Sequence, residues 1–194
     1  MEGSKNMNQH LLLSLLVIAC VLFTGVAQTS QLRRPSHDKQ TLLTKAQQGD
    51  VSAQFWLGTG YEEGWFGKAD YREALKWLRR AANRGNQEAQ NSLGRMYEEG
   101  EGVPQSDVLA AKWYRKAAEH VPDLGGAYQG RNNLGLLYLD GGRGVPKDVV
   151  RAYVWFRLAG MEVNLADAKA QMTAAQVREA ERMATEWKNS HPER

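Results

Sequence analysis

Few side chains in this sequence have the type and spacing that catalysis or metal binding requires. Four histidines are present, and no two of them stand at the spacing of a zinc-binding pair. The run Ser36-His37-Asp38 holds the residue types of a hydrolytic triad, but sequence neighbours do not supply triad geometry. Cys20 is the single cysteine. We therefore expect no catalytic centre, no metal site and no cofactor.

Two further patterns have simpler explanations than chemistry. Glu62-Glu63 is a pair of carboxylates, and it returns 36 residues later as Glu98-Glu99 (98 − 62). This recurrence indicates a helix-end feature rather than a general acid and base. Residues 141–144 (GGRG) are rich in glycine, but they lack the phosphate-loop pattern and follow a predicted helix.

The glutamate pairs belong to a sequence repeat that covers most of the chain. Residues 53–64 and 74–82 return 36 residues later, and a third copy follows at an offset of 41 (134 − 93) that rises to 42 (155 − 113). A loop insertion around His120 to Gly130, where Gly125-Gly126 break the helix, accounts for the longer offset. Self-similarity at this period predicts a stack of helix pairs. The copies span about 53–85, 89–120 and 130–162.

Each copy has the pattern of two amphipathic helices joined by a turn. The first helix carries Ala, Leu and Tyr at intervals of four, and the second carries Ala, Trp and small residues at intervals of three or four. Gly64 and Gly100 are predicted to end first helices in the left-handed conformation. Asp70, Ser106 and Asp148 are predicted to be the N-caps of the second helices.

Partial repeats are predicted at both ends of the array, because the outermost repeats of a stack need a cover. A helix from Lys39 matches the second helix of a repeat, and a short helix is expected over 165–172. Thr173 and Gln176 form a capping box that opens a helix over 174–188. We interpret that last helix as a C-terminal cap, with a partner-binding amphipathic helix as the rival interpretation.

The pattern A-x-x-x-L-G-x-x-Y-x-x-G-x-G-V-P, followed by A-x-x-W-x-x-x-A-A at a period near 36, resembles the Sel-one-like repeat, a relative of the tetratricopeptide repeat. The resemblance covers roughly residues 39–190. It implies an all-α, right-handed α-α superhelix of three helix-pair repeats with helical caps, whose first helices line a concave face. Members of this family mostly act as adaptors that hold proteins or peptides.

The resemblance also implies which residues face a partner. In related tetratricopeptide proteins, the concave positions lie two residues before and two after the Leu of the Leu-Gly pair. Asparagine can pair with both the N–H and the C=O of an extended peptide, and arginine can hold a carboxylate through two hydrogen bonds. We therefore expect a protein or peptide partner at these positions. They are Phe55, Thr59, Asn91, Arg95, Asn132 and Leu136.

Two features depart from the family pattern. Residues 65–69 (WFGKA) replace the Gly-Val-Pro turn in the first copy, so we expect a different turn that exposes two aromatic side chains. Cysteine-rich secreted members staple their repeats with disulfides, whereas this chain has one cysteine. The leading hypothesis is a non-enzymatic interaction scaffold. The alternative is a cell-envelope hydrolase or β-lactam-binding protein, by analogy to the cysteine-rich members.

The N-terminal segment predicts export. Residues 11–26 are uncharged and apolar, short for a membrane span but suited to a secretory signal. We expect a signal peptide over 1–27 and a polar linker over 28–38. Residues 17–20 (VIAC) also resemble a lipobox, which would make Cys20 a lipidation site, and an uncleaved anchor is the third possibility. All three predict a periplasmic, secreted or membrane-anchored domain outside the cytoplasm.

Composition sets the remaining limits. The formal net charge is +3, and the Lys and Arg residues are scattered among acidic ones, so we expect no nucleic-acid partner. Cleavage after Ala27 would leave a mature chain without cysteine, whose stability must come from packing alone. We expect that chain to be a monomer.

Overall fold

The structure, a computed structural model, describes residues 38–119 and 126–192, and these two ranges contain helices and no strand. One isolated β-bridge joins Gly142 and Val145. None of the described helices is both long and apolar enough to span a membrane. The segments expected as signal peptide and linker, with Cys20, lie outside the described residues. The helices are α2 (Lys39–Gln47), α3 (Val51–Glu62), α4 (Tyr71–Asn83), α5 (Gln87–Glu99), α6 (Asp107–Ala118), α7 (Gly126–Asp140), α8 (Val149–Ala159), α9 (Glu162–Ala170) and α10 (Ala174–Ser190).

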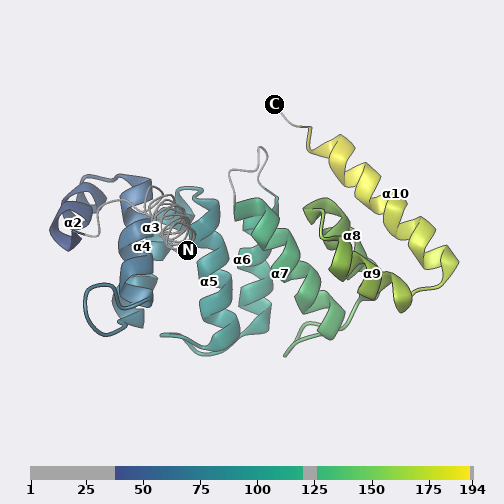
Figure 1. Ribbon diagram of the computed structural model, residues 1–194, viewed down its shortest axis with the longest axis horizontal. Helices are drawn as coiled ribbons and strands as arrows, with labels where there is room; N and C mark the ends of the chain where they lie inside the picture. The colour runs from purple at the N-terminus through teal and green to yellow at the C-terminus, as the bar shows by residue number, and fades with distance from the viewer. Residues whose placement is uncertain (1–37, 120–125, 193–194) are drawn as a thin grey trace, which may run out of the picture. The chain divides into compact units, whose positions relative to one another are not determined.

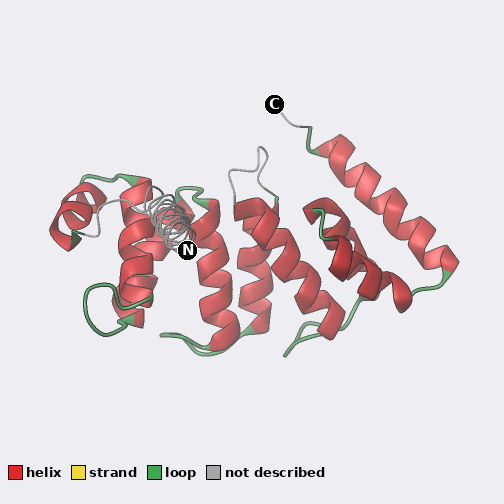
Figure 2. Cartoon of the chain, in the orientation of Figure 1, coloured by secondary structure: helices red, strands yellow, loops and turns green. Residues whose placement is uncertain are grey.

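Each helix packs against the one before it from α2 to α9, and α10 packs against α8 (Figure 1). The pairs α3–α4, α5–α6 and α7–α8 correspond to the three sequence repeats, and loops join the helices (Figure 2). The expected all-α helical repeat fold is confirmed.

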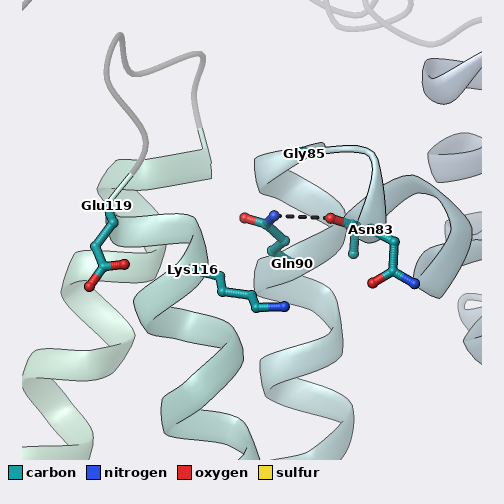
Figure 3. A pocket seen from close by; sticks show the side chains of 6 residues that line it. Asn83, Gly85, Gln90, Lys116 and Glu119 are labelled. Carbon is teal, nitrogen blue, oxygen red and sulfur yellow. Dashed lines mark hydrogen bonds between the residues drawn. The ribbon is translucent and has the colours of Figure 1, made fainter.

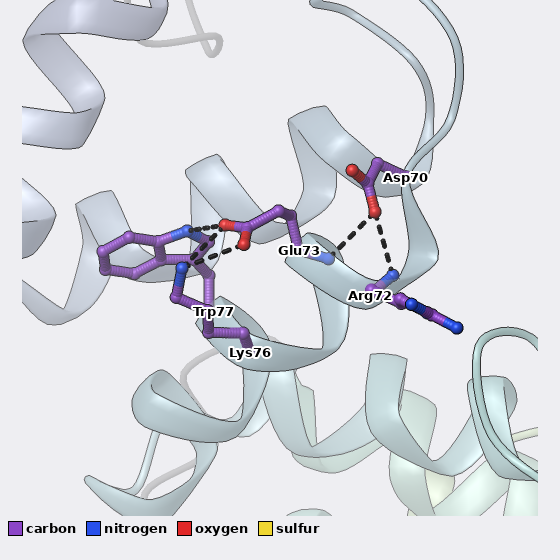
Figure 4. A network of polar contacts seen from close by, with 5 residues as sticks. All are labelled: Asp70, Arg72, Glu73, Lys76 and Trp77. Atoms are coloured by element: carbon purple, nitrogen blue, oxygen red, sulfur yellow. Dashed lines mark hydrogen bonds and ion pairs between the residues drawn. The ribbon is translucent and has the colours of Figure 1, made fainter.

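The predicted N-caps of the second helices are confirmed. The Asp70 carboxylate accepts hydrogen bonds of 3.1 Å from the backbone N–H groups of Arg72 and Glu73 (Figure 4). Glu73 then binds the Lys76 ammonium and the Trp77 indole N–H, so one turn of α4 is tied to its own buried tryptophan. Ser106 and Asp148 cap α6 and α8 in the same way.

The first helices have N-caps that the repeat pattern did not single out. Asp50 accepts from the Ala53 N–H at 2.8 Å, and Asn86 accepts from the Ala89 N–H at 2.7 Å. These caps start α3 and α5 two residues earlier than the repeats drawn from sequence.

A buried or partly buried side chain links each first helix to the end of the preceding helix. The Gln54 amide donates to the Ala46 carbonyl and the Gln90 amide donates to the Ala82 carbonyl, both at 3.0 Å (Figure 3). In the third repeat, Arg131 Nε donates to the Ala118 carbonyl, also at 3.0 Å. Each donor binds a carbonyl at the C-terminal end of the preceding helix, where the last carbonyls lack partners within the helix. The Ala46 and Ala82 carbonyls also accept from the backbone N–H groups of Gly49 and Gly85.

Glycine in each first helix lets a large residue of the second helix approach its backbone. A Cβ added at Gly94 would lie 2.3 Å from the Tyr114 ring, far inside van der Waals contact. Tyr114 is 1% exposed, so it has no free space into which to move. Gly58 with Leu78 and Gly135 with Phe156 repeat this contact.

The structure corrects one sequence expectation about a glycine and shifts the bounds of one expected helix. Gly126 does not break the helix, because α7 begins at Gly126. A Cβ at Gly126 would lie 2.4 Å from the Gln87 side chain, so close packing explains this glycine. The short helix expected over 165–172 begins at Glu162, directly after Gly160 ends α8 with a φ of +70°.

The C-terminal helix covers the last repeat. The expected capping box is present, with the Thr173 hydroxyl and the Gln176 side chain each bound to the other's backbone. Ala180 and Ala184 are buried against the core of the third repeat. The apolar face of α10 is therefore occupied within the chain, as the capping interpretation requires.

We predict that Gly94→Ala destabilises the protein. Alanine favours a helix over glycine by about 1 kcal/mol, but overpacking a core costs about 1–3 kcal/mol. Because the added Cβ would lie only 2.3 Å from a ring that has no space to move, the cost lies at the upper end of that range, and the free energy of unfolding measured by urea denaturation should fall by about 2 kcal/mol. Lys112→Ala, at an exposed position of α6, is the control and should change it by less than about 0.5 kcal/mol. A variant at Gly94 as stable as wild type would contradict the close contact with Tyr114.

Candidate protein-binding face

Where the second and third repeats meet, the first helices lie closer together than the second helices. α5 contacts α7 directly, whereas no comparable contact joins α4 to α6 or α6 to α8 in the described ranges. At this junction the stack therefore curves toward the first helices. We call the side formed by α3, α5, α7 and α9 the inner face, and the side formed by α4, α6 and α8 the outer face.

The six predicted partner-binding residues occupy matching positions on α3, α5 and α7. Leu136 is 38% exposed and the Arg95 side chain is 46% exposed. The others are half-buried, so the inner face offers them only in part. These four are Phe55, Thr59, Asn91 and Asn132.

The asparagines of the inner face bind other amides across the helices. Asn91 Nδ2 donates to Gln129 Oε1 at 3.2 Å and Asn91 Oδ1 accepts from Asn133 Nδ2 at 3.0 Å, which joins α5 to α7. Asn132 Oδ1 accepts from Asn164 Nδ2 at 2.8 Å, which joins α7 to α9. A carboxamide has two donors and two acceptor lone pairs, so part of each is left for a partner.

Arg95 is also engaged. Its guanidinium binds the Glu62 carboxylate on the neighbouring first helix. The Glu62 side chain is 4% exposed, so the ion pair is buried at the glutamate and open to solvent at the arginine. A partner carboxylate that binds Arg95 therefore competes with Glu62.

Burial raises the pKa of Glu62 to about 7. The nearby Arg95 charge lowers it, and the charges of Glu101, Glu63 and Glu99 raise it further. Oε2 of Glu62 and the Thr59 hydroxyl are both buried without a hydrogen-bond partner among the described residues. A buried carboxyl with one charged partner and one unpaired oxygen favours the neutral form.

In the second repeat, the matching glutamate has a different hydrogen-bond partner. Glu98 stands 36 residues after Glu62 and accepts a hydrogen bond from the Tyr114 hydroxyl. The residue 36 before Tyr114 is Leu78, which has no hydrogen-bonding group. The Leu-to-Tyr difference between the two copies was visible in the sequence, but its effect on Glu62 depends on how the repeats pack.

The turn of the first repeat differs from the others, as expected, but it does not expose its two aromatic residues. Trp65 and Phe66 are half-buried, because the turn folds back onto α3. The Trp65 ring stacks on Trp56 at 6.2 Å, and Phe66 meets the ring of Tyr61 at 5.4 Å. Gly60 makes room, since a Cβ there would lie 2.5 Å from Phe66.

The described residues contain no group of three His, Cys, Asp or Glu side chains arranged to hold a metal ion. His37 and Cys20, which the sequence analysis considered for chemistry, lie outside the described residues. The inner face thus presents hydrogen-bonding amides, one half-exposed guanidinium and exposed leucine, which are groups suited to binding.

We predict that Glu62→Gln stabilises the protein more at pH 8 than at pH 5. The pKa of Glu62 in the folded protein lies above its ordinary value of 4.5, so stability is lost as pH rises from about 4.5 to about 7. Glutamine does not titrate and escapes this loss. The difference in unfolding free energy between variant and wild type should increase by about 1–3 kcal/mol from pH 5 to pH 8, as measured by urea denaturation.

The control is Thr59→Val, which removes the neighbouring unpaired hydroxyl without adding or removing a titrating group. Its effect on stability should be equal at the two pH values. A Glu62→Gln effect that is also independent of pH would show that Glu62 is ionised in the folded protein at pH 5.

Comparison with known proteins agrees with this architecture. A search of curated proteins found no match to the sequence. Among solved structures, a protective antigen present in uropathogenic Escherichia coli strains, which displays an SLR fold, is similar at 40% identity with a TM-score of 0.57, over 64% of this chain and 26% of that one. A Sel1 repeat protein from Oxalobacter formigenes is similar at 31% identity with a TM-score of 0.57, over 64% of this chain and 48% of that one.

The match therefore spans about a quarter of the first protein and about half of the second. The family model of the Sel1 repeat matches residues 51–86, 87–120 and 129–162, which hold the three helix pairs. With three successive repeats matched on three packed helix pairs, the chain belongs to the Sel1 repeat family.

Proposed function

We propose that this protein is a non-enzymatic scaffold that binds a segment of a partner protein on its inner face. Sel1 repeat proteins generally mediate protein–protein interactions. The observation that carries the proposal is the row of partly free polar groups across α3, α5 and α7. These groups are linked from helix to helix by side-chain contacts, which fix their spacing before a partner arrives.

The chemistry of this row indicates the kind of segment that fits. The remaining donors and acceptors of Asn91 and Asn132 can pair with the backbone of an extended peptide. Arg95 adds a site for a carboxylate, and Leu136 adds apolar contact. An extended peptide with one acidic and one apolar residue satisfies all of them.

Export and a monomeric state complete the proposal. Export rests on the N-terminal sequence, whose apolar run has the length of a secretory signal. The mature protein would then act in the periplasm or outside the cell.

We predict that Leu136→Glu weakens partner binding at least tenfold, because it places a charge at the centre of the apolar contact. The partner would first be identified by attaching a photo-crosslinker at residue 136 in cells, and its affinity would then be measured by titration calorimetry with both proteins purified.

Leu109→Glu is the matched control. Leu109 is also 38% exposed, but it lies on α6 of the outer face. It should bind the crosslinked partner as wild type does. Equal losses at both positions, or no loss at Leu136, would contradict binding at the inner face.

A second prediction concerns the N-terminus. We expect mass spectrometry of the protein from cells to find a mature chain that begins at Gln28. An acylated Cys20 at the N-terminus would show a lipoprotein, and an intact N-terminus would show an uncleaved anchor.

A further inference from the structure

We propose that the outer face carries a second binding site, which takes an acidic segment of a partner protein and receives one apolar side chain between two arginines. The site lies between α6, α8 and α10, away from the inner face.

A hollow of about 310 Å³ forms the centre of this site. It exists because α6 and α8 do not contact each other as closely as α5 and α7 do, while α10 packs across α8 and supplies one wall. Its volume suits one aromatic or branched aliphatic side chain. The apolar lining consists of Val154, Trp155, Met183 and Trp187.

Two guanidinium groups stand at the rim of the hollow and converge on one tyrosine. Arg115 donates to the Tyr138 hydroxyl at 2.7 Å, and Arg151 lies over the Tyr138 ring at 5.6 Å. Both arginine side chains are exposed. Two like charges held beside the same ring favour an anion that contacts both.

Few acidic side chains pair with these arginines. Asp148 binds Arg151 at 3.3 Å as part of its capping role. Arg115 makes no ion pair within the described ranges, and its one side-chain hydrogen bond goes to the Tyr138 hydroxyl. The anion that the pair favours must therefore come from a partner.

The positive charge continues along α6. A neighbouring hollow of about 380 Å³ is lined by Val108 and Ala111 together with Lys112 and Lys116. Val108 is 51% exposed, and Glu119 is the only acid of this lining. The outer surface of α6 thus alternates apolar contact with cations over three turns.

This pattern matches an acidic peptide with an apolar anchor better than it matches a lipid surface. The apolar lining is recessed behind the arginines, so a ligand must present an apolar group that projects beyond its charges. A side chain flanked by Asp or Glu residues has that geometry, because backbone spacing separates the apolar group from the carboxylates. Such charge complementarity also steers the approach of a partner.

The test uses the full-length chain and a fluorescein-labelled peptide with the sequence Glu-Asp-Phe-Asp-Glu. Binding of the peptide is measured by fluorescence anisotropy. We expect saturable binding that weakens with added salt. Replacing the phenylalanine of the peptide by alanine should weaken binding at least tenfold, and so should the double variant Arg115→Gln/Arg151→Gln.

Two further variants separate the site from the general charge of the protein. Lys112→Gln, whose side chain makes no hydrogen bond or ion pair in the described ranges, should weaken binding about twofold to threefold. Arg178→Gln, at an exposed position of α10 outside both hollows, should leave the affinity unchanged.

The proposal is overturned if the acidic peptide shows no saturable binding, or if the double arginine variant binds it as wild type does. Vesicles containing phosphatidylglycerol are the competing probe. If they bind and the peptide does not, the outer face recognises an anionic membrane surface, and the peptide site is wrong.

Discussion

The close contact between a glycine of each first helix and a large side chain of each second helix is the constraint on which the rest of this structure depends. The large side chain occupies the space of the missing Cβ, so the two helices of a repeat have one permitted register. The repeats then stack through the surfaces that these helix pairs leave exposed. The three pairs are Gly58 with Leu78, Gly94 with Tyr114, and Gly135 with Phe156.

The fixed register has opposite effects on the two faces. First helices come close enough for side chains to reach across, as the Asn91–Asn133 hydrogen bond and the Arg95–Glu62 ion pair show. Second helices spread apart, and the hollow beside Trp155 opens between them. The polar contacts across the inner face and the recessed apolar surface of the outer face therefore both result from the same curvature.

The local features of this fold were predictable from sequence, because they depend on residues a few positions apart. The period, the N-caps Asp70 and Ser106, and the Thr173 capping box all follow from spacing within one helix or turn. Contacts between repeats were not predictable in this way. The partners of Asn91 lie 38 and 42 residues away, and only the stacked helices bring them together.

The glycines also fall into those with a local cause and those whose cause lies in another repeat. A glycine that ends a helix, such as Gly100 with a φ of +78°, has a local cause and a local sequence signal. Gly126 instead makes room for Gln87 of another repeat, and its sequence signal is identical to that of a turn.

Variation between copies links the core to the candidate site. Tyr114 fills the space beside Gly94 and also binds Glu98, whereas Leu78 fills the matching space in the first repeat and binds nothing polar. Glu62 therefore has no tyrosine partner and pairs with Arg95 instead. The Leu or Tyr inside a helix pair thus changes which charged side chains on the inner face are already paired. In a repeat protein, a core residue can thus alter a binding surface without lying on it.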